Sequence, residues 1–150
     1  MPAFKIAGTM ANIPLILASS SRYRRELLDR LGLAYTCVSP EVDETPLAGE
    51  SPVQLCARLA RLKAEAVAKT NPHAVVIGSD QVCDLDGQAL GKPHTFEKAV
   101  AQLMSMQGKR VVFHTAVCVL SPVLPPQETI SDTVITMRAL TEETVRDYVE

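Results

Sequence analysis

The chain has 150 residues, of which 47% are hydrophobic and 21% are charged. This length fits one domain or two small lobes that share a sheet, and the composition is sufficient for a buried core. The net charge of −2, with no basic tail, argues against a protein that binds nucleic acid through bulk electrostatics. No apolar run approaches the roughly 20 residues of a membrane span, so no membrane contact is expected.

The four cysteines indicate a reducing compartment. They are Cys37, Cys56, Cys83 and Cys118, and they form neither a C-x-x-C pair nor a metal-spaced set with histidine. We therefore expect reduced thiols in or near a core, in a cytoplasmic protein. Residues 1–12 lack the long apolar segment of a secretory signal and are expected to form a frayed arm.

The expected elements alternate between strands and helices. In chain order they are a buried strand at 15–18, a helix at 22–31 before Gly32, a strand at 34–39, a helix at 51–70, a strand at 74–80 that ends in Asp80, a hairpin turning at Asp86-Gly87, a helix at 96–107 capped by Thr95, strands at 110–120 and 131–140, and a helix at 142–150 capped by Thr141. This mixture predicts the α/β class with a mixed sheet.

The helix at 51–70 has the clearest local signal. Ser51 at the N-cap, Pro52 at the first helical position and Gln54 at the third form a capping box. The helix at 142–150 is different, because no glycine or proline follows it. We therefore expect the fold to be completed by residues beyond this chain.

A phosphate site is one interpretation of the segment LILASSSRYRREL, residues 15–27. A strand that turns through Ser19 into a helix leaves amide groups and a helix dipole that favour an anion. Arg24 and Arg25 add charge and forked hydrogen bonds. The alternative is a serine-capped surface helix with solvated arginines. Neither a Walker motif nor G-x-G-x-x-G is present.

Asp80 is the second candidate, because a carboxylate after an apolar strand can act as a base on water. Its alternative is a turn aspartate that caps the hairpin. Packed acids at 41–44 would accept a cation, or form a solvated loop. Lys92, between Gly91 and Pro93, would point at a phosphate or remain solvated. The pattern fits metal-assisted attack of water on a phosphate.

Six stretches stand in a specific order: LILASSSRYRRELL, PEVDET, ARLARLKAEAVA, IGSDQV, GKPHT and HTAV. In this order they resemble the Maf family of nucleoside triphosphate pyrophosphatases, from about Leu15 to the end. The resemblance implies one Maf-like domain over 1–150, with a long bent mixed sheet flanked by helices and a cleft between two lobes. It also implies that the C-terminal part of the second lobe lies outside this chain. A homodimer stays open.

The resemblance also assigns roles to residues. Asp80 falls on the position of the proton acceptor, and Glu44 with Asp80 would contact a divalent cation, Mg²⁺ or Mn²⁺. The phosphate-binding positions correspond to Ser19, Arg24, Lys63 and Lys92.

Tyr23 and Gln81 resemble the 7-methyl-GTP pyrophosphatase branch of that family. A methylated guanine is cationic and is attracted to an aromatic face, and Gln81 can donate and accept at a base edge. The alternatives are that Tyr23 packs on its helix, that the substrate is dTTP, UTP or another modified nucleotide, or that the chain binds nucleotides without turnover.

Overall fold

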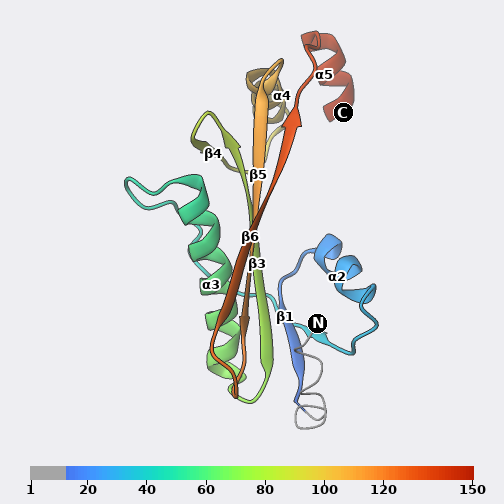
Figure 1. Cartoon of the computed structure of the whole chain (residues 1–150). Coiled ribbons are helices and arrows are strands. Elements are labelled where there is room, and N and C mark those ends of the chain that lie inside the picture. The colour runs from blue at the N-terminus through green and yellow to red at the C-terminus, as the bar shows by residue number, and fades with distance from the viewer. Residues whose placement is uncertain (1–12) are drawn as a thin grey trace. The chain divides into compact units, whose positions relative to one another are not determined.

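The computed structural model describes residues 13–150 (Figure 1). In this range the elements are β1 (Leu15–Ala18), α2 (Arg22–Asp29), β2 (Thr36–Cys37), α3 (Pro52–Thr70), β3 (Val75–Leu85), β4 (Gln88–Leu90), α4 (Phe96–Met106), β5 (Arg110–Leu120), β6 (Gln127–Thr136) and α5 (Glu142–Val149). The predicted α/β class is confirmed. The expected arm at 1–12 lies outside the described residues.

The strands form one mixed sheet in the order β2-β1-β3-β5-β6, with β4 paired to β3. β1 runs parallel to both β2 and β3, whereas β4 is antiparallel to β3. The β1–β3 register ends at the pair Ala18 and Gly78. Since β3 continues to Leu85, its second half extends beyond the end of β1.

The chain divides into two compact units. Among the described residues, the first comprises 13–45, 57–79 and 117–129, and the second comprises 46–56, 80–116 and 130–150. The core of the first unit includes Leu17, Ala18, Ala64 and Val76, all less than 4% exposed. In the second unit, buried side chains of Leu85, Met106 and Val111 form a cluster.

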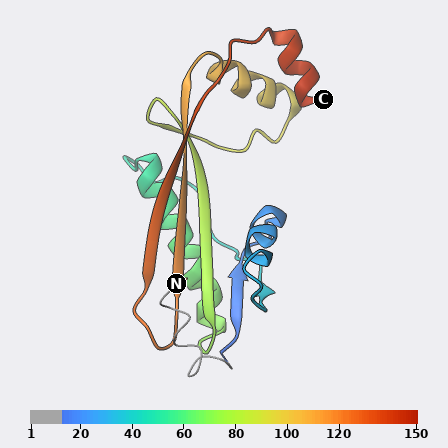
Figure 2. The ribbon, with the colours of Figure 1, turned by 45° about the vertical axis from the view of Figure 1, so that its right-hand side comes forward.

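In the first unit, β1 leads directly into α2 (Figure 2). α2 is shorter than the predicted 22–31, because the chain turns after Asp29 and Gly32 has a φ of 68°. The predicted strand at 34–39 is reduced to Thr36–Cys37. Leu28 of α2 is buried, whereas Leu31, in the turn after the helix, is 61% exposed.

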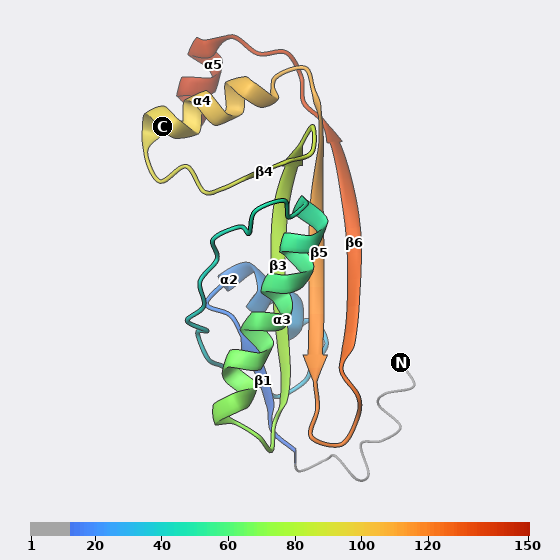
Figure 3. The same ribbon diagram turned by 90° about the vertical axis from the view of Figure 1, so that its left-hand side faces the viewer.

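Helix α3 runs along β3 and packs closely against it (Figure 3). A Cβ added at Gly78 would lie 2.7 Å from the Cβ of Ala64, and closer still to the carbonyl oxygen of Ala60. The absence of a side chain at Gly78 therefore allows this close approach. The predicted capping box is confirmed: the Ser51 Oγ accepts from the Gln54 amide at 3.2 Å, and the Gln54 Oε1 accepts from the Ser51 amide at 3.0 Å.

Strand β3 differs from the prediction. It does not end at Asp80 but continues to Leu85, because residues 83–85 pair with β4 and so prolong the strand. The predicted hairpin turn after it is confirmed, with φ values of 52° at Asp86 and 86° at Gly87.

In the second unit, α4 and α5 pack against each other (Figure 3). Their predicted caps are confirmed, since the hydroxyls of Thr95 and Thr141 accept from amides three residues later. Phe96, at the start of α4, is 40% exposed, and its ring lies 5.7 Å from the guanidinium carbon of Arg146.

β6 begins and ends four residues before the predicted 131–140, because a shorter turn follows β5. None of the helices within residues 13–150 has the length and hydropathy needed to span a membrane.

Candidate active site

The start of α2 brings two predicted site residues together. The Ser19 Oγ accepts from the Ser21 amide at 3.0 Å and lies 3.4 Å from the Nη1 of Arg24. Ser21 is the N-cap, and its Oγ accepts from the Arg24 amide at 3.3 Å. Ser19 is 4% exposed, so a guanidinium, a buried hydroxyl and a helix N-terminus meet here.

Tyr23 lies on the same helix and is 65% exposed. The alternative that it packs against the helix surface predicts a covered ring, and the observed exposure argues against that. Most of the residue is therefore accessible to solvent.

Lys63 and Glu44 form the second pair in the first unit. The Lys63 Nζ lies 3.0 Å from the Glu44 Oε1, and the Lys63 side chain is only 12% exposed whereas that of Glu44 is 60% exposed. The acidic loop is thus held by a cation from α3. Asp43 makes local contacts instead. Hydrogen bonds from the Thr45 side chain and, next in size, from the Thr45 amide at 2.9 Å hold the pKa of Asp43 below its usual range.

Asp80 is buried within β3, at 6% exposure. Its position two residues after the last β1–β3 pair places it beyond the carboxyl end of β1, although not at the end of its own strand. The hairpin-capping alternative is wrong, because the Asp84 Oδ1 accepts from the Gly87 amide at 2.8 Å and performs that task. Gln81 follows Asp80 and donates through its Nε2 to the Thr115 Oγ1 at 3.3 Å.

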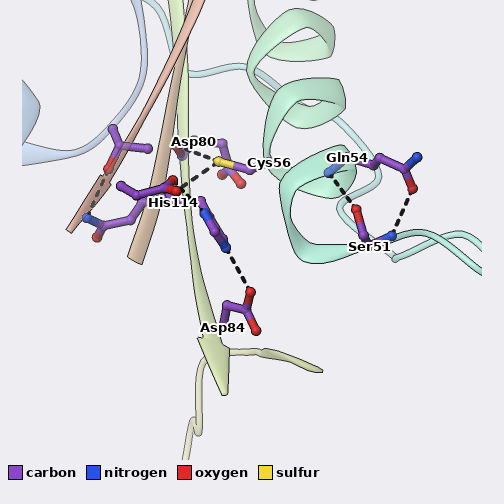
Figure 4. A network of polar contacts seen from close by, with 9 residues as sticks. Ser51, Gln54, Cys56, Asp80, Asp84 and His114 are labelled. Atoms are coloured by element: carbon purple, nitrogen blue, oxygen red, sulfur yellow. Dashed lines mark hydrogen bonds and ion pairs between the residues drawn. The ribbon is translucent and has the colours of Figure 1, made fainter. Parts of the chain in front are cut away.

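A polar network surrounds the backbone of Asp80 in the second unit (Figure 4). The Cys56 Sγ lies 3.2 Å from the carbonyl oxygens of both Asp80 and His114. The His114 ring lies between two carboxylates, with Nε2 at 2.8 Å from Asp84 and Nδ1 at 2.7 Å from Asp132.

Two opposing effects act on the pKa of His114. Burial by itself lowers the pKa of His114, but hydrogen bonds to Asp84 and Asp132, together with their charges, raise it above its usual value overall. With both ring nitrogens facing carboxylate oxygens, the protonated imidazolium satisfies both contacts.

Sequence reasoning missed Cys56 and His114. The only signal for His114 was the HTAV stretch, which was quoted without a role. For Cys56, the only sequence signal was its position on the buried side of the predicted helix at 51–70.

Lys92 is exposed on the loop between β4 and α4 in the second unit. The backbone before it is held by the Gln102 Nε2, which donates to the Gly91 carbonyl at 2.6 Å. The predicted site residues thus fall into two sets. Ser19, Tyr23, Arg24, Glu44 and Lys63 belong to the first unit, and Asp80, Gln81 and Lys92 to the second.

The described part of the chain contains no group of three or more His, Cys, Asp or Glu side chains arranged to hold a metal ion. The predicted cation ligands, Glu44 and Asp80, supply hard carboxylate oxygens. Mg²⁺ is commonly held by one or two carboxylates together with substrate phosphates. Each of these carboxylates, one in each unit, is of the kind that contacts a cation arriving with a polyphosphate.

Comparison with known proteins decides the family. The model of the family described as Maf-like protein matches residues 14–150. The chain belongs to the Maf family. The resemblance drawn from the six sequence stretches is therefore confirmed.

Relatives of this Maf chain include the 7-methyl-GTP pyrophosphatase of Polaromonas sp., 52% identical over 143 residues that cover 95% of this chain and 65% of the relative. The protein of the same name from Burkholderia orbicola is 62% identical over 107 residues, covering 69% of this chain and 51% of the relative. The Maf chain thus spans about half to two thirds of these relatives.

The fold of the Maf chain is similar to the solved structure of the Staphylococcus aureus Ham1 protein. The TM-score is 0.58 at 18% identity, and the match covers 82% of this chain and 71% of that one.

Proposed function

We propose that this Maf protein hydrolyses 7-methyl-GTP to 7-methyl-GMP and pyrophosphate. The observation that carries the proposal is Asp80, a buried carboxylate that lies on β3 just beyond the last pair with β1. The name that the two relatives share supports both the reaction and the identity of the nucleobase in the substrate.

Asp80 would accept a proton from water as the water oxygen attacks phosphorus. The bond between the α- and β-phosphates then breaks and pyrophosphate leaves. A carboxylate within hydrogen-bond reach of the water is the requirement for this general-base step.

Arg24, Lys63 and Lys92 would neutralise charge on the triphosphate, with Ser19 as a hydroxyl donor. The Ser19–Arg24 contact supports this role, because the hydroxyl orients the guanidinium at the start of α2. Lys63 is held by Glu44 at 3.0 Å, so an incoming phosphate would compete with that carboxylate for the ammonium. Groups preset in this way contribute more to catalysis than flexible ones, because they need little reorganisation.

The base would be recognised by Tyr23 and Gln81. The exposed ring of Tyr23 offers a face to the cationic 7-methylguanine. The Gln81 amide nitrogen is bonded to Thr115, which directs its carbonyl oxygen toward other donors, such as those on the Watson–Crick edge of guanine.

A Mg²⁺ or Mn²⁺ ion would arrive with the phosphates, and Glu44 of the first unit and Asp80 of the second are each a candidate ligand for it. When bound, the cation would offset negative charge on the triphosphate. We place the protein in the cytoplasm, because none of its four cysteines forms a disulfide.

The test is pyrophosphate release over a panel of 7-methyl-GTP, GTP, UTP and dTTP with Mg²⁺ or Mn²⁺. It is run on this chain and on a version extended by the C-terminal residues of the Polaromonas relative. We expect 7-methyl-GTP to have the highest kcat/KM. A preference for UTP or dTTP would refute the assignment of the nucleobase. If neither version releases pyrophosphate from any of the nucleotides, a nucleotide-binding protein without turnover is the better account.

A further inference from the structure

We propose that Cys56 is a positioning residue for Asp80. Its thiol, on α3, fixes the backbone of β3 at the residue that carries the catalytic carboxylate. The inference rests on the proposed function, and it adds a residue to which that function assigned no role.

The geometry of the thiol is specific. The Cys56 Sγ lies 3.2 Å from the Asp80 carbonyl oxygen on β3 and 3.2 Å from the His114 carbonyl oxygen on β5. One side chain from a helix thus contacts two neighbouring strands at the level of Asp80, as Figure 4 shows. Because these contacts are to backbone atoms, they restrain the direction in which the Asp80 side chain leaves the strand.

A thiol suits this position for a physical reason. Cys56 is 0% exposed, so any polar group here must satisfy its hydrogen bonds within the protein. A cysteine packs as a small hydrophobe and still offers a weak S–H donor. A branched apolar side chain would fill the space but would give the two carbonyl groups no donor.

Further hydrogen bonds restrain both the helix that carries Cys56 and the strands that its thiol contacts. On α3, the capping box of Ser51 and Gln54 holds the turn from which Cys56 projects. On the sheet, His114 is bonded through its ring to Asp84 on β3 and Asp132 on β6. The residue that accepts from Cys56 therefore belongs to a cross-strand network, and a movement of the helix would be transmitted to Asp80.

The experiment compares Cys56→Ala with Cys118→Ala. Cys118 is a matched control, because it is 1% exposed and lies on β5 within the first unit, whereas Asp80 belongs to the second. Each variant is measured for kcat and KM on 7-methyl-GTP, for Tm, and for amide hydrogen exchange of peptides containing residues 80–82. Cys56→Ser is the conservative variant, since its hydroxyl retains a donor.

We expect Cys56→Ala to lower kcat about tenfold with little change in KM, as small displacements of a reacting group do. Cys118→Ala should leave kcat unchanged at a similar loss of Tm, and Cys56→Ser should recover most of the rate. Exchange at 80–82 should accelerate in Cys56→Ala alone. Equal effects of the two alanine variants on kcat and on exchange, or no rescue by serine, would overturn the proposal.

The hydrogen-exchange measurement separates this proposal from the proposed function. If the parent chain releases no pyrophosphate, the proposed function fails, while exchange at 80–82 still reports whether Cys56 holds the Asp80 backbone. If the parent chain hydrolyses the nucleotide but Cys56→Ala changes neither kcat nor hydrogen exchange at residues 80–82, the proposed function stands and the positioning role is wrong.

Discussion

The residues proposed for the site differ sharply in exposure. Asp80 is 6% exposed, whereas Tyr23 is 65% exposed on α2. The buried carboxylate is suited to proton transfer, because desolvation strengthens its interactions with a reacting water. The exposed ring is suited to capturing a base from solution.

Tyr23 can be tested by removing its aromatic face. Tyr23→Leu should raise the KM for 7-methyl-GTP about tenfold, because a cation–π contact contributes on the order of 1 kcal/mol or more. Tyr23→Phe retains the face and is the control, with a KM near that of the parent. Steady-state kinetics on 7-methyl-GTP and on GTP, whose guanine is uncharged, would separate a cation–π effect from a general loss of binding. An equal loss on both nucleotides would contradict the cationic interpretation.

His114 makes stability depend on pH. Its pKa is raised in the folded state above the unfolded value of about 6.5. The stabilisation is therefore fully present below about pH 6.5 and is lost as pH rises through the folded-state pKa. Thermal unfolding between pH 6 and pH 9 should show Tm falling with pH in the parent chain.

His114→Gln should flatten that fall, since an amide does not titrate in this range. Asp132→Asn is a gentler variant, because the Asp132 side chain is 53% exposed and one ion pair to Asp84 remains. It should lower the pH at which stability is lost. An unchanged slope in both variants would show that His114 does not carry the effect.

Among the elements, α3 has the most clearly defined boundaries. Its start is set by the reciprocal bonds of Ser51 and Gln54, and its middle by close packing on Gly78 of β3. Because Cys56 lies one turn into the helix, these contacts also determine where its thiol is held.

Loss of the cap should destabilise the protein. Ser51→Ala is expected to lower the free energy of unfolding by about 1 kcal/mol, because it removes the acceptor for the Gln54 amide. Ser105→Ala within α4 is the matched control and should be nearly neutral, since a serine inside a helix provides no cap. Urea titrations of both variants give the comparison. Equal losses would argue against the capping role.

The packing of α3 on β3 depends on Gly78. Gly78→Ala should lower the free energy of unfolding by about 1–3 kcal/mol, because its Cβ would collide with the backbone of Ala60 and Ala64. Gly91→Ala is the control, since a Cβ there meets nothing within 4 Å. If urea denaturation finds the two variants equally stable, the close helix–sheet contact is wrong.

Across the whole molecule, local sequence signals predicted the helices and strands. They missed features that depend on contacts between different segments of the chain. The capping residues Ser51, Thr95 and Thr141 were found from sequence because a cap is a local event. The end of β3 was misplaced, because the first arm of the hairpin continues the same strand and pairs with β4. The network of Cys56 and His114 could not be predicted, because it joins residues that are distant in the sequence.

The candidate site was predicted from the sequence as a set of residues, without their arrangement. In the structure Ser19 contacts Arg24 and Lys63 contacts Glu44, whereas the roles of these residues in binding phosphate or a cation stay predictions. Asp80 is the first residue of β3 that belongs to the second unit, because the division between the units falls between Ser79 and Asp80.

The most direct test of the account is the effect of Asp80→Asn on turnover and on binding. In the parent chain and its C-terminally extended version, pyrophosphate release from 7-methyl-GTP and nucleotide binding by calorimetry are measured side by side. Removal of a general base commonly costs about 10²–10⁴-fold in rate. The account predicts a loss of that size in kcat, with nucleotide binding retained. Turnover that persists at the parent rate in Asp80→Asn would contradict it.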